Sequence, residues 1–237
     1  MEIFIVIVII LIASILQTST GFGFSILATP FLLFIFEPME AIQINIILSL
    51  VISFALINKI KKDIDYGILR RFVIGSALGL PIGIIIFLAL DLKNLIFGIS
   101  LVILVLTILL ILKYRIAQTN SKDIVIGGLS GVLTSSIGMP GPPLLLYFSG
   151  TDTKKEKLRS TTLAFYLFIY SMSLVIQVIF VGTNRTIWMT SGFALPLVLL
   201  GLYLGQVLFK KINQRFFRIF TYIILLFTGI YLLAESW

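Results

Sequence analysis

Long uninterrupted runs of apolar residues constrain this chain more than any other feature of its sequence. They consist mainly of Ile, Leu, Val and Phe and lie at 3–16, 26–36, 46–57, 72–90, 94–112, 163–181, 193–209 and 216–233. A helix crosses roughly 30 Å of hydrocarbon with about 20 apolar residues, whereas strands of a membrane β-barrel alternate polar and apolar residues. With 59% hydrophobic and 12% charged residues, the chain is predicted to be an all-α polytopic membrane protein.

The charged residues argue against catalysis inside the membrane. The chain has no Cys and no His, which excludes thiol chemistry, imidazole proton relays and Cys/His metal sites. All 10 acidic residues lie at expected loops or span ends, and no hydroxyl nucleophile has an adjacent base. We therefore expect no catalytic residue, no metal and no cofactor. The net charge of +8 comes from Lys and Arg in short loops, so the expected partner is the lipid bilayer and not nucleic acid.

The two halves of the chain resemble each other. Residues 75–83 (GSALGLPIG) lie over residues 197–205 (LVLLGLYLG), and each stretch precedes a polar break and an apolar span. Both contain the G-x-x-x-G spacing, which lets membrane helices pack closely. Earlier in each half, Thr18–Gly23 lies over Ser135–Pro140. We expect two transmembrane repeats, 1–118 and 119–237, that together form one membrane domain.

The positions of Lys and Arg favour an opening segment that folds back in each half. If the opening segments (1–36 and 124–149) fold back, sixteen of the basic residues lie on one side of the membrane, with Lys93 and Arg185 on the other. If each segment crosses once, the division is nine and nine, which the positive-inside rule disfavours. Three spans follow each segment, so the expected fold has two inverted-topology repeats, each an interrupted fold-back hairpin followed by three transmembrane helices, with both termini outside.

The form of each opening segment is open between a shallow re-entrant loop and a pair of short full-length helices. We favour the helix pair, because residues 2–18 alone reach about 25 Å at ~1.5 Å per residue.

Each opening segment contains a break that is rich in Gly, Pro and hydroxyl side chains, at 17–25 and 134–143. Unwound backbone inside a membrane is tolerated where protein buries it or where it lines a cavity. The half-helices after the breaks begin near Ser25 and Pro143, and their free N–H groups attract anions. The predicted substrate-binding residues are Thr18, Ser19, Thr20, Gly21, Gly23, Ser25, Thr134, Ser135, Ser136, Gly138 and Gly141.

Close packing is the alternative explanation for the same small residues. We favour packing for the G-x-x-x-G glycines and substrate binding for the two breaks, because hydroxyls and helix breakers coincide there twice. Arg159 lies at the basic end of a span, where it suits the lipid headgroups, and it is also a candidate to guide an anion to the site. Gln43 and Asn45 are expected to form hydrogen bonds between helices.

The breaks resemble a known family. Thr20-Gly-Phe-Gly23 leading to Pro30, and Gly138-Met-Pro-Gly141-Pro-Pro143, are similar to the motifs that open each half of the TauE/SafE sulfite exporter family, also called toluene sulfonate uptake permeases. Lys61-Lys-Asp-Ile-Asp65 and Lys157-Leu-Arg159-Ser-Thr161 resemble its basic loop and its R-x-T motif. The chain departs from the pattern at Phe22, Phe24 and Pro140.

The resemblance implies a permease of the cytoplasmic membrane for small anions, above all sulfur-containing ones such as sulfite, sulfoacetate and other organosulfonates. We expect the substrate to bind at the midplane between the two breaks and to move by alternating access. The alternative is a membrane scaffold or assembly factor that transports nothing. The expected partners are a small anionic substrate, the lipid bilayer and, in a homodimer, a second copy of the chain.

Overall fold

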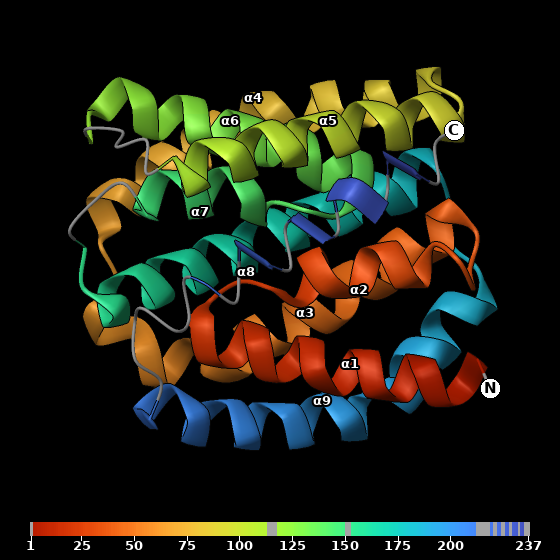
Figure 1. Ribbon diagram of the computed structural model, residues 1–237, viewed down its shortest axis with the longest axis horizontal. Helices are drawn as coiled ribbons and strands as arrows, with labels where there is room; N and C mark the ends of the chain where they lie inside the picture. Colours follow the sequence, from red (N-terminus) through yellow and green to blue (C-terminus); the bar gives the residue numbers. More distant parts are fainter. Residues whose placement is uncertain are drawn as a thin grey trace.

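The computed structural model describes residues 2–112, 118–149 and 153–211, together with scattered residues between 219 and 234. Within these ranges the chain forms helices and no strand (Figure 1), which confirms an all-α fold. The helices are α1 (Glu2–Thr20), α2 (Phe24–Leu32), α3 (Pro38–Ile60), the 3-10 helix η1 (Lys61–Asp63), α4 (Tyr66–Ala89), α5 (Leu92–Ile111), α6 (Asn120–Ile137), α7 (Gly141–Ser149), α8 (Lys155–Phe180) and α9 (Arg185–Lys211).

Four segments of the described chain are long and apolar enough to cross a membrane, and these are α3 with η1, α4, α8 and α9. The apolar run at 46–57 is the inner part of α3, which begins at Pro38 because a proline at a helix N-terminus loses no hydrogen bond. α4 begins after Asp65, whose side chain accepts a hydrogen bond from the Ile68 N–H at 3.0 Å. The last expected span, 216–233, lies mostly outside the described residues.

Each opening segment is a long helix followed by a short one that turns back (Figure 1). α1 has 19 residues and α6 has 18, whereas α2 and α7 have 9 each. Nine residues of helix extend about 14 Å, roughly half of the hydrocarbon thickness. The expected pair of full-length helices is therefore wrong for α2 and α7, which are half-helices.

The opening helix of each half packs against a helix of the other half. α1 lies along α9 and α6 lies along α4, while α3 packs on α8 between them. The contacts are close because glycines face the partner backbone: a methyl group added at Gly75 or Gly79 would overlap the carbonyl oxygens of Ile124 or Gly128 in α6. A methyl group added at Gly201 would overlap the Ser14 Cβ of α1. Close packing by the G-x-x-x-G glycines is confirmed; the inverted orientation and the division at 118/119 stay predictions.

Basic residues gather at one end of the bundle. The ends of α3 and α9 and the beginnings of α4 and α8 lie together at the left of Figure 1, whereas α5 and α9 begin at the other end. We call the first of these the basic end. The described Lys and Arg residues there are Lys59, Lys61, Lys62, Arg70, Arg71, Lys122, Lys154, Lys155, Lys157, Arg159, Lys210 and Lys211. Lys113, Arg115, Arg215 and Arg218 lie outside the described residues.

We expect Gly79→Ala to destabilise the packing of α4 on α6. The added methyl group would overlap α6 backbone, which cannot move away as a flexible side chain would, and such overpacking costs roughly 1–3 kcal/mol. Gly192→Ala in α9 is the matched control, because no heavy atom lies within 4 Å of the added group. Thermal unfolding in detergent measures both, and an equal midpoint for the two variants would contradict the close contact.

The charge distribution predicts that the basic end faces the cytoplasm. The chain has no Cys, so maleimide labelling reports the accessibility of the one cysteine that a variant introduces. An impermeant maleimide added to intact cells should label Thr183→Cys, in the loop between α8 and α9, and leave Lys62→Cys unlabelled until the cells are permeabilised. The reverse labelling pattern would overturn this orientation.

Candidate functional site

The first break is a tight turn between α1 and α2 that only glycine adopts without strain. Gly21 and Gly23 have φ angles of 90° and 114°, in the left-handed region. The Thr20 hydroxyl donates a hydrogen bond to the Leu16 carbonyl at 2.6 Å and accepts one from the Phe22 N–H at 3.0 Å. The turn therefore satisfies part of its own backbone, which is necessary in a medium without water.

The second break ends α6 in a left-handed C-cap at Gly138. Gly138 has a φ angle of 72°, its N–H donates to the Thr134 carbonyl at 2.7 Å, and the Met139 N–H donates to the Leu133 carbonyl at 3.1 Å. α7 then begins at Gly141 with two prolines in its first turn, where a missing N–H leaves no partner unsatisfied. Both breaks thus follow from residues whose backbone preferences stop one helix and start another.

Amide side chains from other helices hold the second break. Asn45 on α3 donates from Nδ2 to the Gly138 carbonyl at 2.8 Å, and Gln177 on α8 donates from Nε2 to the Ser135 carbonyl at 2.8 Å. All four residues are buried or nearly so. The predicted hydrogen bond between helices is confirmed for Asn45, and it is made to unwound backbone.

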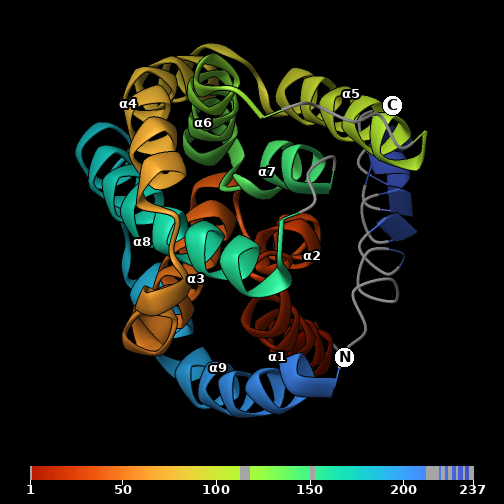
Figure 2. The same ribbon diagram turned by 90° about the vertical axis from the view of Figure 1, so that its left-hand side faces the viewer.

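The half-helices α2 and α7 begin beside each other in the middle of the bundle. Figure 2 looks onto the basic end and shows α2 and α7 at the centre, with α1 and α9 on one side and α4 and α6 on the other. A methyl group added at Gly141 would lie 3.0 Å from the Tyr166 hydroxyl oxygen and 3.2 Å from Ile26 of α2. The positive ends of two helix dipoles therefore meet near Tyr166.

Most of the predicted hydroxyls donate to carbonyls of their own helix, as Ser and Thr commonly do in membrane helices. This group consists of Ser19, Thr20, Thr134 and Ser136. Ser135 donates to Leu80 of α4 at 2.7 Å. Thr18 and Ser25 differ, because their hydroxyls are buried and have no hydrogen-bond partner among the described residues. Of the predicted hydroxyls, these two are free to donate to a ligand.

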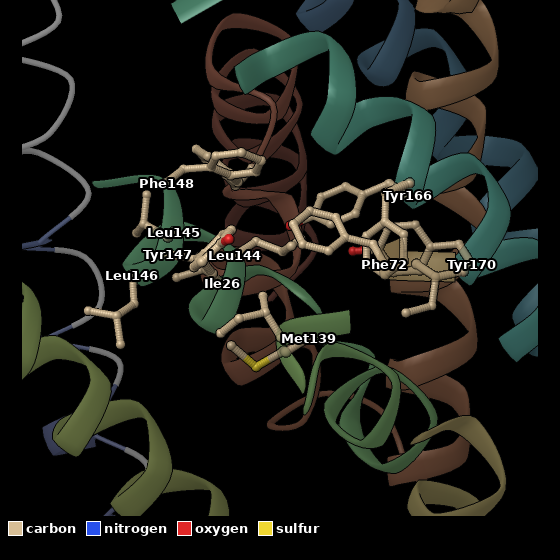
Figure 3. Close-up of a cluster of buried hydrophobic side chains, with 14 of the residues drawn as sticks. Ile26, Phe72, Met139, Leu144, Leu145, Leu146, Tyr147, Phe148, Tyr166 and Tyr170 are labelled. Carbon is tan, nitrogen blue, oxygen red and sulfur yellow. The ribbon is translucent and has the colours of Figure 1, made fainter. Parts of the chain in front are cut away.

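Two tyrosines on α8 extend this group of unpartnered hydroxyls. Tyr166 and Tyr170 are fully buried, and their ring centroids are 5.1 Å apart (Figure 3). Ser25 and Ser49 are near enough to the Tyr170 hydroxyl to interact with it, yet all four hydroxyls lack a hydrogen bond of acceptable geometry in the described chain. A buried polar group without a partner costs about 1–3 kcal/mol. We define these four residues as the hydroxyl cluster.

The hydroxyl cluster lies between two groups of apolar side chains. Ile26 packs with α7 and α8 in the cluster of Figure 3, together with Met139 and Leu144. Phe24 and Ala28, on the other side of α2, pack with α1, α3 and α9. Apolar surroundings strengthen any hydrogen bond made inside them.

Arg159 lies beneath the first break and is almost fully buried. Its side chain is 7% exposed, its Nε donates to the Thr18 carbonyl at 2.7 Å, and its guanidinium lies over the Phe209 ring at 4.3 Å. Thr18 is in the last turn of α1, where carbonyl groups have no partner within the helix. Gly21 packs directly on the Arg159 backbone. Arg159 therefore fixes the end of α1 to α8.

The loop before α4 joins the same region. The Asp65 carboxylate pairs with Lys157 at 2.6 Å, and the Asp65 N–H donates to the Thr161 hydroxyl at 2.9 Å. Burial alone would raise the pKa of Asp65, but the hydrogen bond and charge of Lys157 and the Ile68 N–H together hold this pKa below its ordinary value. The two short motifs at 61–65 and 157–161 are thus neighbours in space.

One carboxylate expected at a helix end is fully buried. Asp123, in the first turn of α6, pairs with Arg71 of α4 at 2.6 Å and accepts a hydrogen bond from the Tyr147 hydroxyl of α7. Arg71, whose side chain is 27% exposed, thus supplies the counter-charge of the buried Asp123 carboxylate. Asp123 links α7 to α4 and α6 near the basic end.

The structure thus brings the two predicted breaks to one central region and adds residues that the sequence analysis missed. Tyr166, Tyr170 and Ser49 were overlooked because single polar residues in long apolar runs appear isolated. The spacing of Tyr166 and Tyr170, four residues apart on one helix face, was the available signal. Within the described residues, no group of His, Cys, Asp and Glu is placed to hold a metal ion.

Comparison with known proteins identifies a family. A family model described as "Sulfite exporter TauE/SafE" matches residues 6–232, nearly the whole chain. Searches of curated proteins and of solved structures each found no match.

Gly21→Ala should destabilise the protein more than an alanine substitution at a left-handed glycine that has no close neighbours. Alanine in the left-handed conformation costs about 1–2 kcal/mol, and at Gly21 its methyl group would also lie 3.0 Å from the Arg159 Cα. Gly182→Ala is the control, because Gly182 has a φ angle of 92° and open space around it. Thermal unfolding should rank wild type above Gly182→Ala and Gly182→Ala above Gly21→Ala. An equal loss in both variants would show that the contact with α8 contributes nothing.

Proposed function

The chain belongs to the sulfite exporter TauE/SafE family, which indicates a membrane exporter or permease, and from this premise we propose a transporter of small, mainly sulfur-containing anions. Sulfite, sulfoacetate and other organosulfonates are the proposed substrates. One observation carries the proposal: two half-helices begin beside each other at the centre of the bundle, next to a cluster of buried hydroxyls. Within the described residues, no carbonyl or carboxylate accepts a hydrogen bond from these hydroxyls.

Neutral donors suit a permease for oxyanions. A sulfite or sulfonate group carries three oxygens that accept hydrogen bonds, and the hydroxyls of Ser25, Tyr166 and Tyr170 supply donors from α2 and α8. The N-termini of α2 and α7 add their positive dipole ends, which are a common anion site in proteins and in transporters. A site without a full positive charge holds an anion less tightly than an Arg or Lys site, and transport requires release as well as binding.

The predicted residues divide into two roles in this proposal. Ser25, Thr18 and the backbone after Gly23 and Gly141 contribute donors. Ser19, Thr20, Thr134, Ser135, Ser136, Gly21 and Gly138 form the breaks and hold their shape. The apolar neighbours Ile26 and Met139 would contact the organic part of a sulfonate.

We propose that transport proceeds by rocking of two bodies past the contact between α3 and α8. The glycine contacts make α1 with α9, and α4 with α6, two closely packed pairs. α2 and α7 lie between these pairs (Figure 2), so a relative rotation would open the site to one side at a time. A membrane scaffold, the alternative function, would need close packing but gives no reason for unpartnered hydroxyls at the centre.

Tyr166→Phe and Ser25→Ala should weaken substrate binding while the protein stays folded. A hydrogen bond to a charged group contributes about 1.5–3 kcal/mol, so we expect KM for sulfite or a short sulfonate to rise at least tenfold. Tyr203→Phe is the control, because Tyr203 is 67% exposed on the outer surface of α9. Flux of radiolabelled anions into proteoliposomes gives KM, and size-exclusion profiles check folding.

Two results would count against the proposal. Absence of saturable flux with sulfite, several sulfonates and small carboxylates would favour the scaffold. Wild-type KM in both Tyr166→Phe and Ser25→Ala would remove the hydroxyl cluster from the substrate site, even if the protein transports anions.

A further inference from the structure

A cavity of about 200 Å³ opens at the basic end of the bundle, next to the first break. The end of α3, the beginning of α8 and the end of α9 line it, and its cationic side chains are Lys59, Arg159 and Lys210. We call it the basic-end cavity. The geometry points to a second anion site here, in which a small oxyanion is held before it passes to the centre. This inference rests on the proposed transport function.

Arg159 is the main reason to expect an anion in the basic-end cavity. Its side chain is 7% exposed, and within the described part of the chain no carboxylate lies within 4.0 Å of it. The hydrogen bond from Nε to Thr18 is the one that Arg159 makes to described residues, although a guanidinium has five N–H donors. A buried charge without a partner is costly in a membrane protein and marks functional sites. An oxyanion would supply the missing counter-charge and accept two parallel hydrogen bonds.

The volume of the cavity limits which anions can occupy it. A volume of about 200 Å³ lies below the ~300–1,000 Å³ typical of pockets for drug-sized ligands. Sulfite, sulfate, phosphate or a short sulfonate fits with a few water molecules at roughly 30 Å³ each. Phe209 covers one side of the Arg159 guanidinium at 4.3 Å, which limits access to its other side and edge.

The remaining charges make this a site of modest affinity. Asp63 and Glu156 also line the cavity, and neither forms an ion pair with any described residue. Three cations and two acids leave an excess of one positive charge, which attracts a monovalent anion without trapping it. Lys59 of α3 donates a hydrogen bond to the Gln206 side chain of α9 at 2.8 Å, so its ammonium group is held at the cavity before an anion binds.

The basic-end cavity adjoins the route to the centre. Arg159 contacts the Thr18 carbonyl, and Gly21 packs on the Arg159 backbone. An anion bound to Arg159 is therefore adjacent to the first break, which leads into α2 and Ser25. An anion that binds the guanidinium would compete with the Thr18 carbonyl. Loss of the hydrogen bond between Arg159 and Thr18 would loosen the end of α1.

The occupant has two sources with the same chemistry, a free solute oxyanion and the phosphate of a lipid headgroup. Lys210→Gln tests the site without touching the central donors, since Lys210 is an exposed residue at the rim of the cavity. Lys62→Gln is the matched control, an exposed cation at the same end that does not line the cavity. We expect Lys210→Gln to raise KM for sulfite three- to tenfold from the basic side and to leave KM from the other side unchanged, whereas Lys62→Gln changes neither.

The measurement uses proteoliposomes sorted by orientation, made from phosphatidylcholine alone or with phosphatidylglycerol. An effect of Lys210→Gln in phosphatidylcholine alone assigns the site to the solute anion. Inhibition of wild type by phosphatidylglycerol that Lys210→Gln relieves assigns it to a headgroup phosphate. Wild-type KM for Lys210→Gln from both sides and in both lipids overturns the second site but leaves the transport function intact. Absence of flux in the wild type overturns both.

Discussion

The absence of water around an unwound backbone is the constraint on which the rest of this structure depends. Each break leaves carbonyl and N–H groups without helical partners inside the bundle, and in a membrane protein each such group needs a partner from the protein. Arg159 supplies one at the first break, and Asn45 and Gln177 supply two at the second. Because these side chains come from α3 and α8, the two central helices hold the breaks in place. Among the described residues, the hydroxyl cluster and Thr18 are exceptions to this rule, and our proposal assigns the hydroxyl cluster to a ligand.

Local patterns in the sequence predicted the helices and the breaks. The roles of individual side chains depend on contacts between residues that are far apart in the chain. The apolar runs, the two breaks and the glycine spacing are local, so the all-α membrane fold and the close packing of α4 on α6 could be predicted. The length of α2 could not, because the apolar run at 26–36 continues beyond the helix end at Leu32. The role of Arg159 depends on contact with Thr18, 141 residues away in the chain. The periodicity of apolar residues does not indicate contacts between residues so far apart in the chain.

Charge is placed differently in the two polar regions of the bundle. The central hydroxyl cluster contains no formal charge, whereas the region at the basic end contains the Arg71–Asp123 pair, the Asp65–Lys157 pair and Arg159, which has no ion-pair partner among the described residues. Both pairs connect helices and are satisfied, so they fix positions. Arg159 connects a helix end to α8 and keeps unused donors. In the proposed function, a buried cation near one end and neutral donors at the centre would give an anion a graded path, from stronger attraction to easier release.

The contact between α1 and α9 has a consequence for how the protein is made. α1 is synthesised before α9, the helix whose glycines pack against it, and more than 160 residues separate the two helices in the sequence. At roughly 5–20 residues per second, α1 spends on the order of ten seconds or more in the membrane before its partner exists. During that time Thr18 also lacks Arg159, and the polar end of the helix has no protein around it. The nascent chain therefore passes through a stage at which α1 depends on lipid, water or the insertion machinery for contacts that α9 and α8 supply in the folded protein.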